Sequence, residues 1–569
     1  MKGLKIMKTK LLYLTVVFGL MLGFAGCNMD YYPSDEQSSD VIMKEASSMI
    51  MDGCYSLLKD EVEYLGYPSG NTYCRHWFQL AEFPADNICL SGRSTDPLFQ
   101  AATYTMTDNL QNVGTVWMVG YKIINMTNTL IETLDENKAE NKQTIGEAYF
   151  MRALIHLNLV TLFAQPYSYG RGNMGIPLRT SMISNETKRD QVGDVYDRIV
   201  SDLQKAATLL GNSRGNAGYP SKDAALGLLS RVYLYMEKYD DCISTVETML
   251  GGSINAANCK AKLDPNLAKY FINAKTSSET LFCIAHEVTE DRGQSSIGSM
   301  YNKDGGGWGE IYPSFPLLTL YERYPEDVRY KEFIRPQYEN GAAPSSTYKF
   351  YMPNGDTGTE KKRDVKKVTG YYDAGTDSYY FFDEGIKYTI EKRTVQGEYI
   401  EYHALYKGED LLVMYWPDNL ETRETYPKFY MTKFGYQDGS PTLSSPVVLR
   451  WAEVILNAAE AYARNGNATA ALMLVDVIRE RAGIPAEGLF SGNMHGYTDA
   501  VDIVMDERRL ELAFEGHRMF DVYRNKKNMD RHYPGVQEWK TVLYTDPHTQ
   551  YPIPNGEWMV SHISQNPGY

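Results

Sequence analysis

Two stretches far apart in the sequence share one helix–turn–helix pattern. In the first, Ser221 can cap a helix over about 224–236, and a second helix follows a short turn. In the second, apolar residues at helical spacing predict a helix over 448–464, a turn at 465–467 and another helix. Helix pairs of this kind bury their apolar faces against neighbouring pairs. The sequence therefore predicts a mainly α framework of stacked helix pairs.

A third strongly periodic segment, 144–164, places apolar residues on one helix face. The helical repeats occupy about 110–250 and 446–525, and their pattern is that of tetratricopeptide repeats, which predicts a partial tetratricopeptide-like superhelix. Residues from about 290 to 440 are rich in Gly, Tyr, Asp and Pro and have little helical period. They predict an irregular, loop-rich binding face with minor β-hairpins, such as 386–406.

The N-terminus has the pattern of a bacterial lipoprotein signal. Lysines come first, an apolar run ends at Phe24, and small residues lead into Cys27. We predict that residues 1–26 are a signal peptide, that Cys27 is lipidated, that 27–40 are a flexible acidic tether, and that 41–569 are one domain. The alternative is a secreted protein with an incidental cysteine. A transmembrane helix is disfavoured because the apolar run falls short of the ~20 residues needed to span a bilayer.

The charge of the chain argues against nucleic acid as a partner. Its net charge is −15, and removing the lysines of the signal makes it more negative. Such a chain is repelled by phosphate backbones and by anionic lipid headgroups, so we expect membrane contact through the lipid anchor alone. The six cysteines that follow Cys27 are too sparse for a disulfide scaffold and lack zinc-ligand spacing.

Motifs spread along nearly the whole chain identify a family. They are a loose match at Ala81–Asp86, then Gly146–Ala153, Leu449–Val454, Asp506–Asp521, Tyr551–Glu557 and Gln565–Tyr569. In this order, and behind this signal, they resemble the SusD/RagB family of outer-membrane nutrient-binding lipoproteins. The resemblance implies a lipid-anchored protein on the extracellular face of the cell outer membrane of Bacteroidetes-type bacteria. Such a protein captures a nutrient, usually a glycan, and delivers it to a TonB-dependent transporter of the SusC type.

Acidic and basic residues alternate in the strongest of these motifs. They are Glu507, Glu511 and Glu515 with Arg508, Arg509 and Arg518. Paired carboxylates could indicate a glycoside hydrolase. The interleaved arginines favour structural ion pairs instead, because such pairing keeps carboxylates ionised and unsuited to acid catalysis. We predict the same role for Glu147 with Arg152 and for Arg450 with Glu453.

The sequence contains no recognisable catalytic or cofactor-binding motif. We therefore predict a binding protein that is not an enzyme and that has no catalytic residues, cofactor or catalytic metal. The alternatives are a glycoside hydrolase and a binder of a non-sugar cargo such as a peptide. Asp373, Asp377 and Asp383 are candidate ligands of a structural calcium ion, although their spacing departs from that of an EF-hand.

Exposed aromatic side chains are the expected ligand contacts, because a sugar ring has an apolar face and a polar rim. Trp308 is the leading candidate, since it lies in a run of glycines where an indole gains no local core. The family resemblance implies further contacts in the middle region and in a loop at about 88–104. The other candidates are Tyr301, Asn302, Tyr312, Arg93, Asp96, Tyr67, Tyr73 and Trp77. The tryptophans predicted to be structural are Trp117, Trp451, Trp539 and Trp558.

Overall fold

The computed structural model describes residues 36–64, 66, 70–92, 96, 99–183, 188–355, 362–396 and 399–569, with side chains from residue 46 onward. The chain divides into two units, residues 1–50 and 51–569. Residues 1–35 lie outside the described ranges. They include the predicted signal peptide, Cys27 and most of the predicted tether. Residues 36–40, which we also predicted to be tether, instead form the first turns of helix α2 (Glu36–Lys59).

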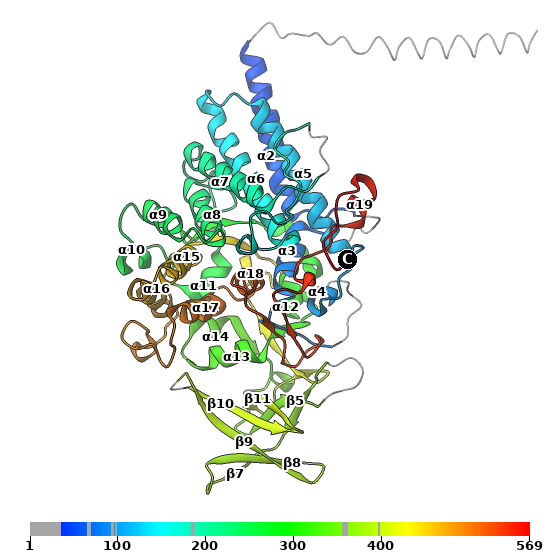
Figure 1. Cartoon of the computed structure of the whole chain (residues 1–569), viewed down its shortest axis with the longest axis vertical. Helices are drawn as coiled ribbons and strands as arrows, with labels where there is room; N and C mark the ends of the chain where they lie inside the picture. The colour runs from blue at the N-terminus through cyan, green and yellow to red at the C-terminus, as the bar shows by residue number, and fades with distance from the viewer. Residues whose placement is uncertain are drawn as a thin grey trace, which may run out of the picture. The chain divides into compact units, whose positions relative to one another are not determined.

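The protein is mainly α-helical, as predicted (Figure 1). The further helices are α3 (Tyr73–Glu82), α4 (Phe99–Thr103), α5 (Gln111–Thr133), α6 (Lys142–Phe163), α7 (Val192–Leu209), α8 (Lys222–Tyr235), α9 (Tyr239–Leu250), α10 (Ala256–Lys260), α11 (Leu267–Tyr270), α12 (Gly298–Tyr301), α13 (Phe315–Glu322), α14 (Val328–Phe333), α15 (Trp451–Arg464), α16 (Ala468–Arg481), α17 (Ala500–Glu511), α18 (Arg518–Arg524) and α19 (Asn555–Ser561). Successive helices from α5 to α9 pack against each other, and α15 packs on α8, α9, α16 and α17. The two predicted helix pairs, α8–α9 and α15–α16, are therefore neighbours.

Local chemistry sets the ends of these helix pairs. The Ser221 side chain accepts a hydrogen bond from the backbone of Ala224 and caps α8, as predicted. Asn467 caps α16 in the same way after the predicted turn. The prediction that a helix starts at residue 448 is wrong, because Val447–Arg450 forms strand β15 and pairs with β2 (Thr280–Cys283). Tertiary pairing thus overrides the helical period at this end.

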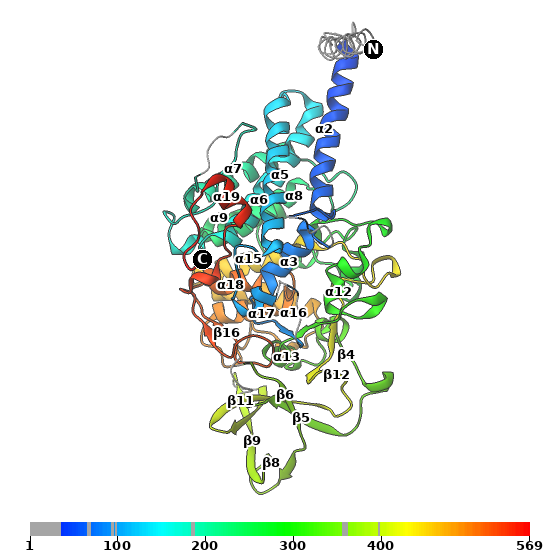
Figure 2. The same cartoon turned by 90° about the vertical axis from the view of Figure 1, so that its right-hand side faces the viewer.

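The middle of the chain is far more regular than we predicted. Seven strands form one antiparallel sheet in the order β6-β5-β11-β10-β9-β8-β7. They are β5 (Tyr348–Pro353), β6 (Val365–Val368), β7 (Tyr371–Asp373), β8 (Ser378–Asp383), β9 (Ile386–Val395), β10 (Tyr399–Tyr406) and β11 (Glu409–Pro417). The predicted hairpin 386–406 is confirmed as β9 and β10. The sheet lies beyond α13, on the side away from α5 and α6 (Figure 1 and Figure 2).

One face of this sheet carries its own apolar core. Phe350, Phe381, Ile390 and Val413 are buried there, one from each of four strands. Successive side chains of a strand point to opposite faces of the sheet, so only every second residue of each strand faces this core. The remaining strands form short pairs: β1 (Ile88–Leu90) with β3 (Ile311–Pro313), β4 (Ile334–Pro336) with β14 (Phe429–Met431), β12 (Thr422–Arg423) with β13 (Tyr426–Pro427), and β16 (Met529–Asp530) with β17 (Thr541–Val542).

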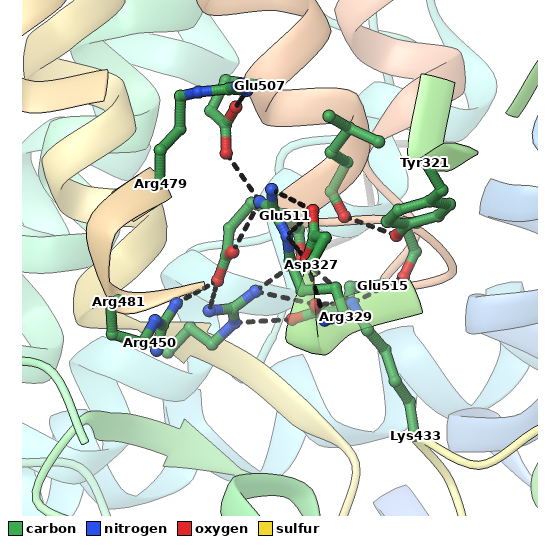
Figure 3. Close-up of polar contacts among 12 residues, drawn as sticks. Tyr321, Asp327, Arg329, Lys433, Arg450, Arg479, Arg481, Glu507, Glu511 and Glu515 are labelled. Atoms are coloured by element: carbon green, nitrogen blue, oxygen red, sulfur yellow. Dashed lines mark hydrogen bonds and ion pairs between the residues drawn. The ribbon is translucent and has the colours of Figure 1, made fainter. Parts of the chain in front are cut away.

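A buried network of ion pairs ties the helices together (Figure 3). Its cations are Arg329, Lys433, Arg450, Arg479 and Arg481, and its anions are Glu279, Asp327, Glu507, Glu511 and Glu515. Burial opposes ionisation of Glu511, but Arg481, Arg450 and Arg329 outweigh it and hold the pKa of Glu511 well below its ordinary value. The prediction that the acids of this motif form structural ion pairs is confirmed.

The partners of several charged residues differ from our prediction. They are Arg214 for Glu147, Asp202 for Arg152, Arg231 for Glu453, and Glu279, Glu511 and Glu515 for Arg450. Residues five apart on a helix point about 140° apart, so Glu147 cannot face Arg152. Each of these charges pairs with a residue from another segment of the chain. A buried charge without an opposite partner is energetically costly, and tertiary folding supplies that partner.

Two further properties bear on location and redox chemistry. Within the described ranges, no helix is long and apolar enough to cross a membrane. The six cysteines from Cys54 to Cys283 are all buried and free. Burial raises the pKa of the Cys54 thiol to about 12, so this thiol is protonated and unreactive in the folded protein.

Candidate ligand-binding surface

A glycine-built loop between α12 and β3 presents Trp308 to solvent. The backbone amides of Trp308 and Gly309 both donate to the carbonyl oxygen of Ser299, at 2.6 and 3.0 Å, which folds the loop back onto α12. A Cβ at Gly307 would lie 2.2 Å from the carbonyl oxygen of Asn302, so only glycine fits there. Gly309 adopts a positive φ of 54°. Glycine at these two positions therefore allows the loop to adopt the conformation in which it carries the indole.

The Trp308 side chain is 46% exposed, which is unusual for a tryptophan in a folded domain. Its indole N–H donates to the carbonyl oxygen of Gln294 at 3.2 Å, so the ring is held in one orientation. Arg423 approaches the other side of the loop, where it donates to the carbonyl oxygen of Trp308 at 3.1 Å and pairs with Glu310. The ring is thus a pre-oriented apolar face at the surface.

Polar side chains lie in the same loop region. Arg335 donates to Asp304 at 2.6 Å and to the Tyr436 hydroxyl at 2.8 Å, and Tyr436 also donates to Asp304. Burial opposes ionisation of Asp304, but the hydrogen bonds from Tyr436 and Arg335 keep its pKa below the ordinary value. Asp304 and Arg335 remain more than 40% exposed. We call Trp308, Asp304, Arg335, Arg423 and Tyr436 the Trp308 surface.

The structure brings together the two regions that the sequence indicated separately. Strand β1, at the start of the predicted loop 88–104, pairs with β3, and Cys89 lies opposite Tyr312. The Ser91 backbone and side chain both donate to the carbonyl oxygen of Glu310, at 3.0 and 2.9 Å. The front loop therefore begins directly beside the segment that carries Trp308.

Most of the other predicted contact residues lie in the interior of the protein. Tyr73, Trp77, Tyr301, Asn302 and Tyr312 are all buried. The Tyr312 hydroxyl donates to the carbonyl oxygen of Gly309 at 2.9 Å, and Tyr301 packs against aromatic rings of the core. A buried side chain offers no face to a ligand from solvent, so we correct the prediction that these five residues contact it.

The remaining predictions have mixed outcomes. Asp96 lies 4.0 Å from the Arg75 guanidinium, while Tyr67 and Arg93 lie outside the described residues. Trp117 and Trp451 are buried, as predicted for core residues. Trp558, which we predicted to be structural, is 46% exposed on α19. Arg335, Arg423 and Tyr436 were missed because they meet the loop only through tertiary folding and share no local sequence pattern with it. Asp304 was missed although it lies in the loop itself.

The candidate calcium ligands point to separate partners. Asp377 pairs with Lys392 at 2.7 Å, and Asp383 pairs with Lys366. Asp373 accepts a hydrogen bond from the backbone of Gly375 at 3.0 Å. Among the described residues, no group of three or more His, Cys, Asp or Glu side chains is arranged to hold a metal ion.

Two family models match the chain. Residues 275–569 match the model of the SusD family, and residues 81–234 match a model described as starch-binding associating with outer membrane. Together these regions contain nearly all of α8, the pair α15–α16, the sheet and the loop that carries Trp308, whereas α9 lies between them.

Individual relatives extend the likeness to most of the chain. SusD-like protein P2 of Formosa agariphila is 24% identical over 500 residues, which cover 82% of each chain. A SusD superfamily protein from Bacteroides thetaiotaomicron is similar in structure, with a TM-score of 0.66 and 21% identity over 92% of this chain and 99% of that one. A laminarin-binding SusD-like protein gives a TM-score of 0.59 and 20% identity over 92% and 99%. At these identities the likeness to solved structures establishes the fold alone.

Proposed function

The chain belongs to the SusD family, and on that premise we propose that it is a surface lipoprotein of the outer membrane that captures an oligo- or polysaccharide and delivers it to a SusC-like TonB-dependent transporter. We also propose that the helix pairs α8–α9 and α15–α16 belong to a tetratricopeptide-like framework, and that this framework holds the ligand face in place.

The observation that carries the glycan proposal is the exposed, oriented indole of Trp308. An indole face complements the C–H face of a pyranose ring, and a fixed ring loses little conformational entropy when the sugar binds. Asp304, which belongs to the same loop, and its partner Arg335 are both more than 40% exposed and can hydrogen-bond to sugar hydroxyls. The family description that names starch and the laminarin-binding neighbour support the same ligand class.

Binding without cleavage is favoured by the state of the acidic residues. Glu507, Glu511 and Glu515 are buried and paired with several cations. A glycosidase needs one carboxyl that stays protonated near neutral pH and lies beside the scissile bond. Burial opposes ionisation of Glu511 and Glu515, but their cations hold both pKa values below the ordinary value. All three carboxylates lie inside the core, so none of them meets both conditions. We therefore propose that the glycan leaves the protein with its length unchanged.

The anchor proposal rests on Cys27 and on the family description, which places related proteins at the outer membrane. A cysteine that carries two or three acyl chains would hold the domain on the membrane almost permanently, since each buried methylene contributes about 0.8 kcal/mol. Replacing Cys27 with Ser should release the protein into the soluble fraction. If the Cys27→Ser protein stays with the membranes, lipidation at this residue is refuted.

Affinity electrophoresis in gels that contain laminarin or soluble starch tests the binding site. Native protein from Asn28 onward should be retarded by at least one of these polysaccharides. Trp308→Ala should weaken the retardation about tenfold, the effect of roughly 1.4 kcal/mol. Trp558→Ala is the matched control, because this indole is equally exposed but lies on α19. Equal mobility of the Trp308 variant and the wild type would refute the Trp308 surface as the ligand site.

A further inference from the structure

The seven-stranded sheet carries a second group of solvent-facing aromatic rings. Tyr348 from β5, Tyr372 from β7, Tyr379 from β8, Tyr402 from β10 and Tyr415 from β11 form a continuous set, which we call the tyrosine cluster. Their neighbouring ring centroids are 5.1–6.0 Å apart. Tyr348 and Tyr372 are 43% and 53% exposed, and the other three are half-buried.

The cluster shares the face of the sheet that carries the core, since Tyr415 lies opposite Phe350, Tyr379 opposite Ile390 and Tyr402 opposite Val413. Phe350 is 1% exposed, and its ring lies 5.1, 5.5 and 4.6 Å from the rings of Tyr379, Tyr402 and Tyr415. Buried aliphatic and aromatic side chains on the same face already form the core, and Tyr379, Tyr402 and Tyr415 pack against its edge. The exposed parts of the rings, above all those of Tyr348 and Tyr372, contribute little to this core and remain available to a ligand.

Most hydroxyl groups of the cluster have no hydrogen-bond partner within the described part of the chain. Tyr372 donates its hydroxyl proton to Asp377 at 2.7 Å. Within the described part of the chain, the hydroxyls of the other four tyrosines form no hydrogen bond to protein. Each of these four rings thus combines an apolar face with a free donor and acceptor at its tip.

The charges at the edge of the cluster cancel. Lys392 Nζ lies 2.7 Å from Asp377 and 5.4 and 5.7 Å from the ring centroids of Tyr372 and Tyr379. A surface whose lysine and aspartate are paired attracts neither anions nor cations. Its complement is a neutral molecule with an apolar face and a hydroxyl-rich rim.

We propose that the tyrosine cluster is a second glycan-binding site, which takes a segment of a neutral polysaccharide. This inference rests on the proposed function of the protein as a glycan binder. Strands β8 and β9 lie apart from α12, which precedes the Trp308 loop, in both views (Figure 1 and Figure 2), and apart from β4, which carries Arg335, in Figure 2. A long glycan can contact both sites, so its second contact is intramolecular and raises the overall affinity.

The test compares variants of the native protein from Asn28 onward, by affinity electrophoresis against laminarin, soluble starch and anionic alginate. Tyr348→Ala combined with Tyr372→Ala removes the two most exposed rings of the cluster and leaves its base intact. We expect about tenfold weaker retardation by the neutral polysaccharide that retards the wild type. The loss should also occur in the Trp308→Ala background. Tyr371→Ala is the matched control, because Tyr371 is 50% exposed on the same strand but on the opposite face.

Each of the other outcomes refutes the second glycan site and shows which assumption failed. If Trp308→Ala weakens binding and the double tyrosine variant does not, the cluster is not a glycan site and the proposed function stands. If none of these polysaccharides retards the wild type, the proposed function fails and this inference fails with it. If the double variant affects alginate alone, the site is not one for neutral glycans. If it instead abolishes co-purification of a protein partner with glycan binding intact, the occupant is a protein.

Discussion

Glu511 is the centre of the buried ion network, and its neutralisation should destabilise the protein strongly. Its side chain is 1% exposed and contacts Arg329 at 3.1 Å, Arg450 at 2.5 Å and Arg481. The network contains five cations and five anions, so Glu511→Gln leaves one buried positive charge without compensation. Removing one partner of a buried ion pair costs about 3–5 kcal/mol.

The cost should fall near the lower end of that range. Arg329 keeps Asp327, and Arg450 and Arg481 keep other carboxylates after the change. We therefore expect about 3 kcal/mol of lost unfolding free energy. With a urea m-value of about 3 kcal/mol/M or more for a chain of this size, the midpoint should fall by up to about 1 M. Urea unfolding followed by tryptophan fluorescence measures this shift.

Two further variants distinguish the loss of buried ion pairing from a non-specific loss of stability. Glu384→Gln is the surface control, because its side chain is 76% exposed and lies 3.8 Å from Lys407, so its change should stay within about 1 kcal/mol. Adding Arg481→Gln to Glu511→Gln restores the charge balance and should recover part of the loss.

The depressed pKa of Glu511 gives the sign of the pH dependence. Its contribution is fully present above the ordinary carboxyl value of about 4.3 and is lost as pH falls through the folded-state pKa. The difference between wild type and Glu511→Gln should therefore be large at pH 7 and shrink in acid. Equal midpoints at pH 7, or a difference that grows in acid, would refute the reasoning.

Three further predictions concern the loop, the second buried ion pair and the thiols. Gly307→Ala places a Cβ 2.2 Å from a carbonyl oxygen and should weaken polysaccharide retardation, whereas Gly211→Ala, with open space around it, should not. Asp202→Asn leaves the Arg152 side chain, which is fully buried and 2.8 Å from the carboxylate, without its anion, and should lower the urea midpoint through a loss of about 3 kcal/mol. Cys54 and the five other described cysteines are buried and free, so a thiol reagent should label none in native protein and all of them in denaturant. A fast native labelling phase would contradict that burial.

Local sequence signals predicted the helices well. The 144–164 periodicity corresponds to α6, and Ser221 caps α8, because both depend on residues within one or two turns of each other. The same reasoning failed for residues 290–440. Only the hairpin 386–406 was visible there, since the other strand pairs join segments whose alternation is short or interrupted.

The candidate site shows the same division. Trp308 was found from the sequence because glycine neighbours deny an indole any local core. The sequence around Tyr301 and Tyr312 favours ligand contact equally, yet both side chains are buried. Tyr301 packs against Phe434 and Tyr312 lies opposite β1, and both of these partners come from distant segments. Composition near a loop therefore cannot separate side chains that face solvent from side chains that support the loop.

The sequence by itself determined the family, the mainly α framework and the structural role of the acidic motif, because these depend on ordered motifs, helical periodicity and residue type. Tertiary structure decided which charges pair, which aromatic rings reach solvent and that the middle of the chain forms a sheet. Arg450 and Glu515 are 65 positions apart yet 2.9 Å from each other. Burial and long-range pairing depend on the position of every segment at once, and a local pattern does not contain that information.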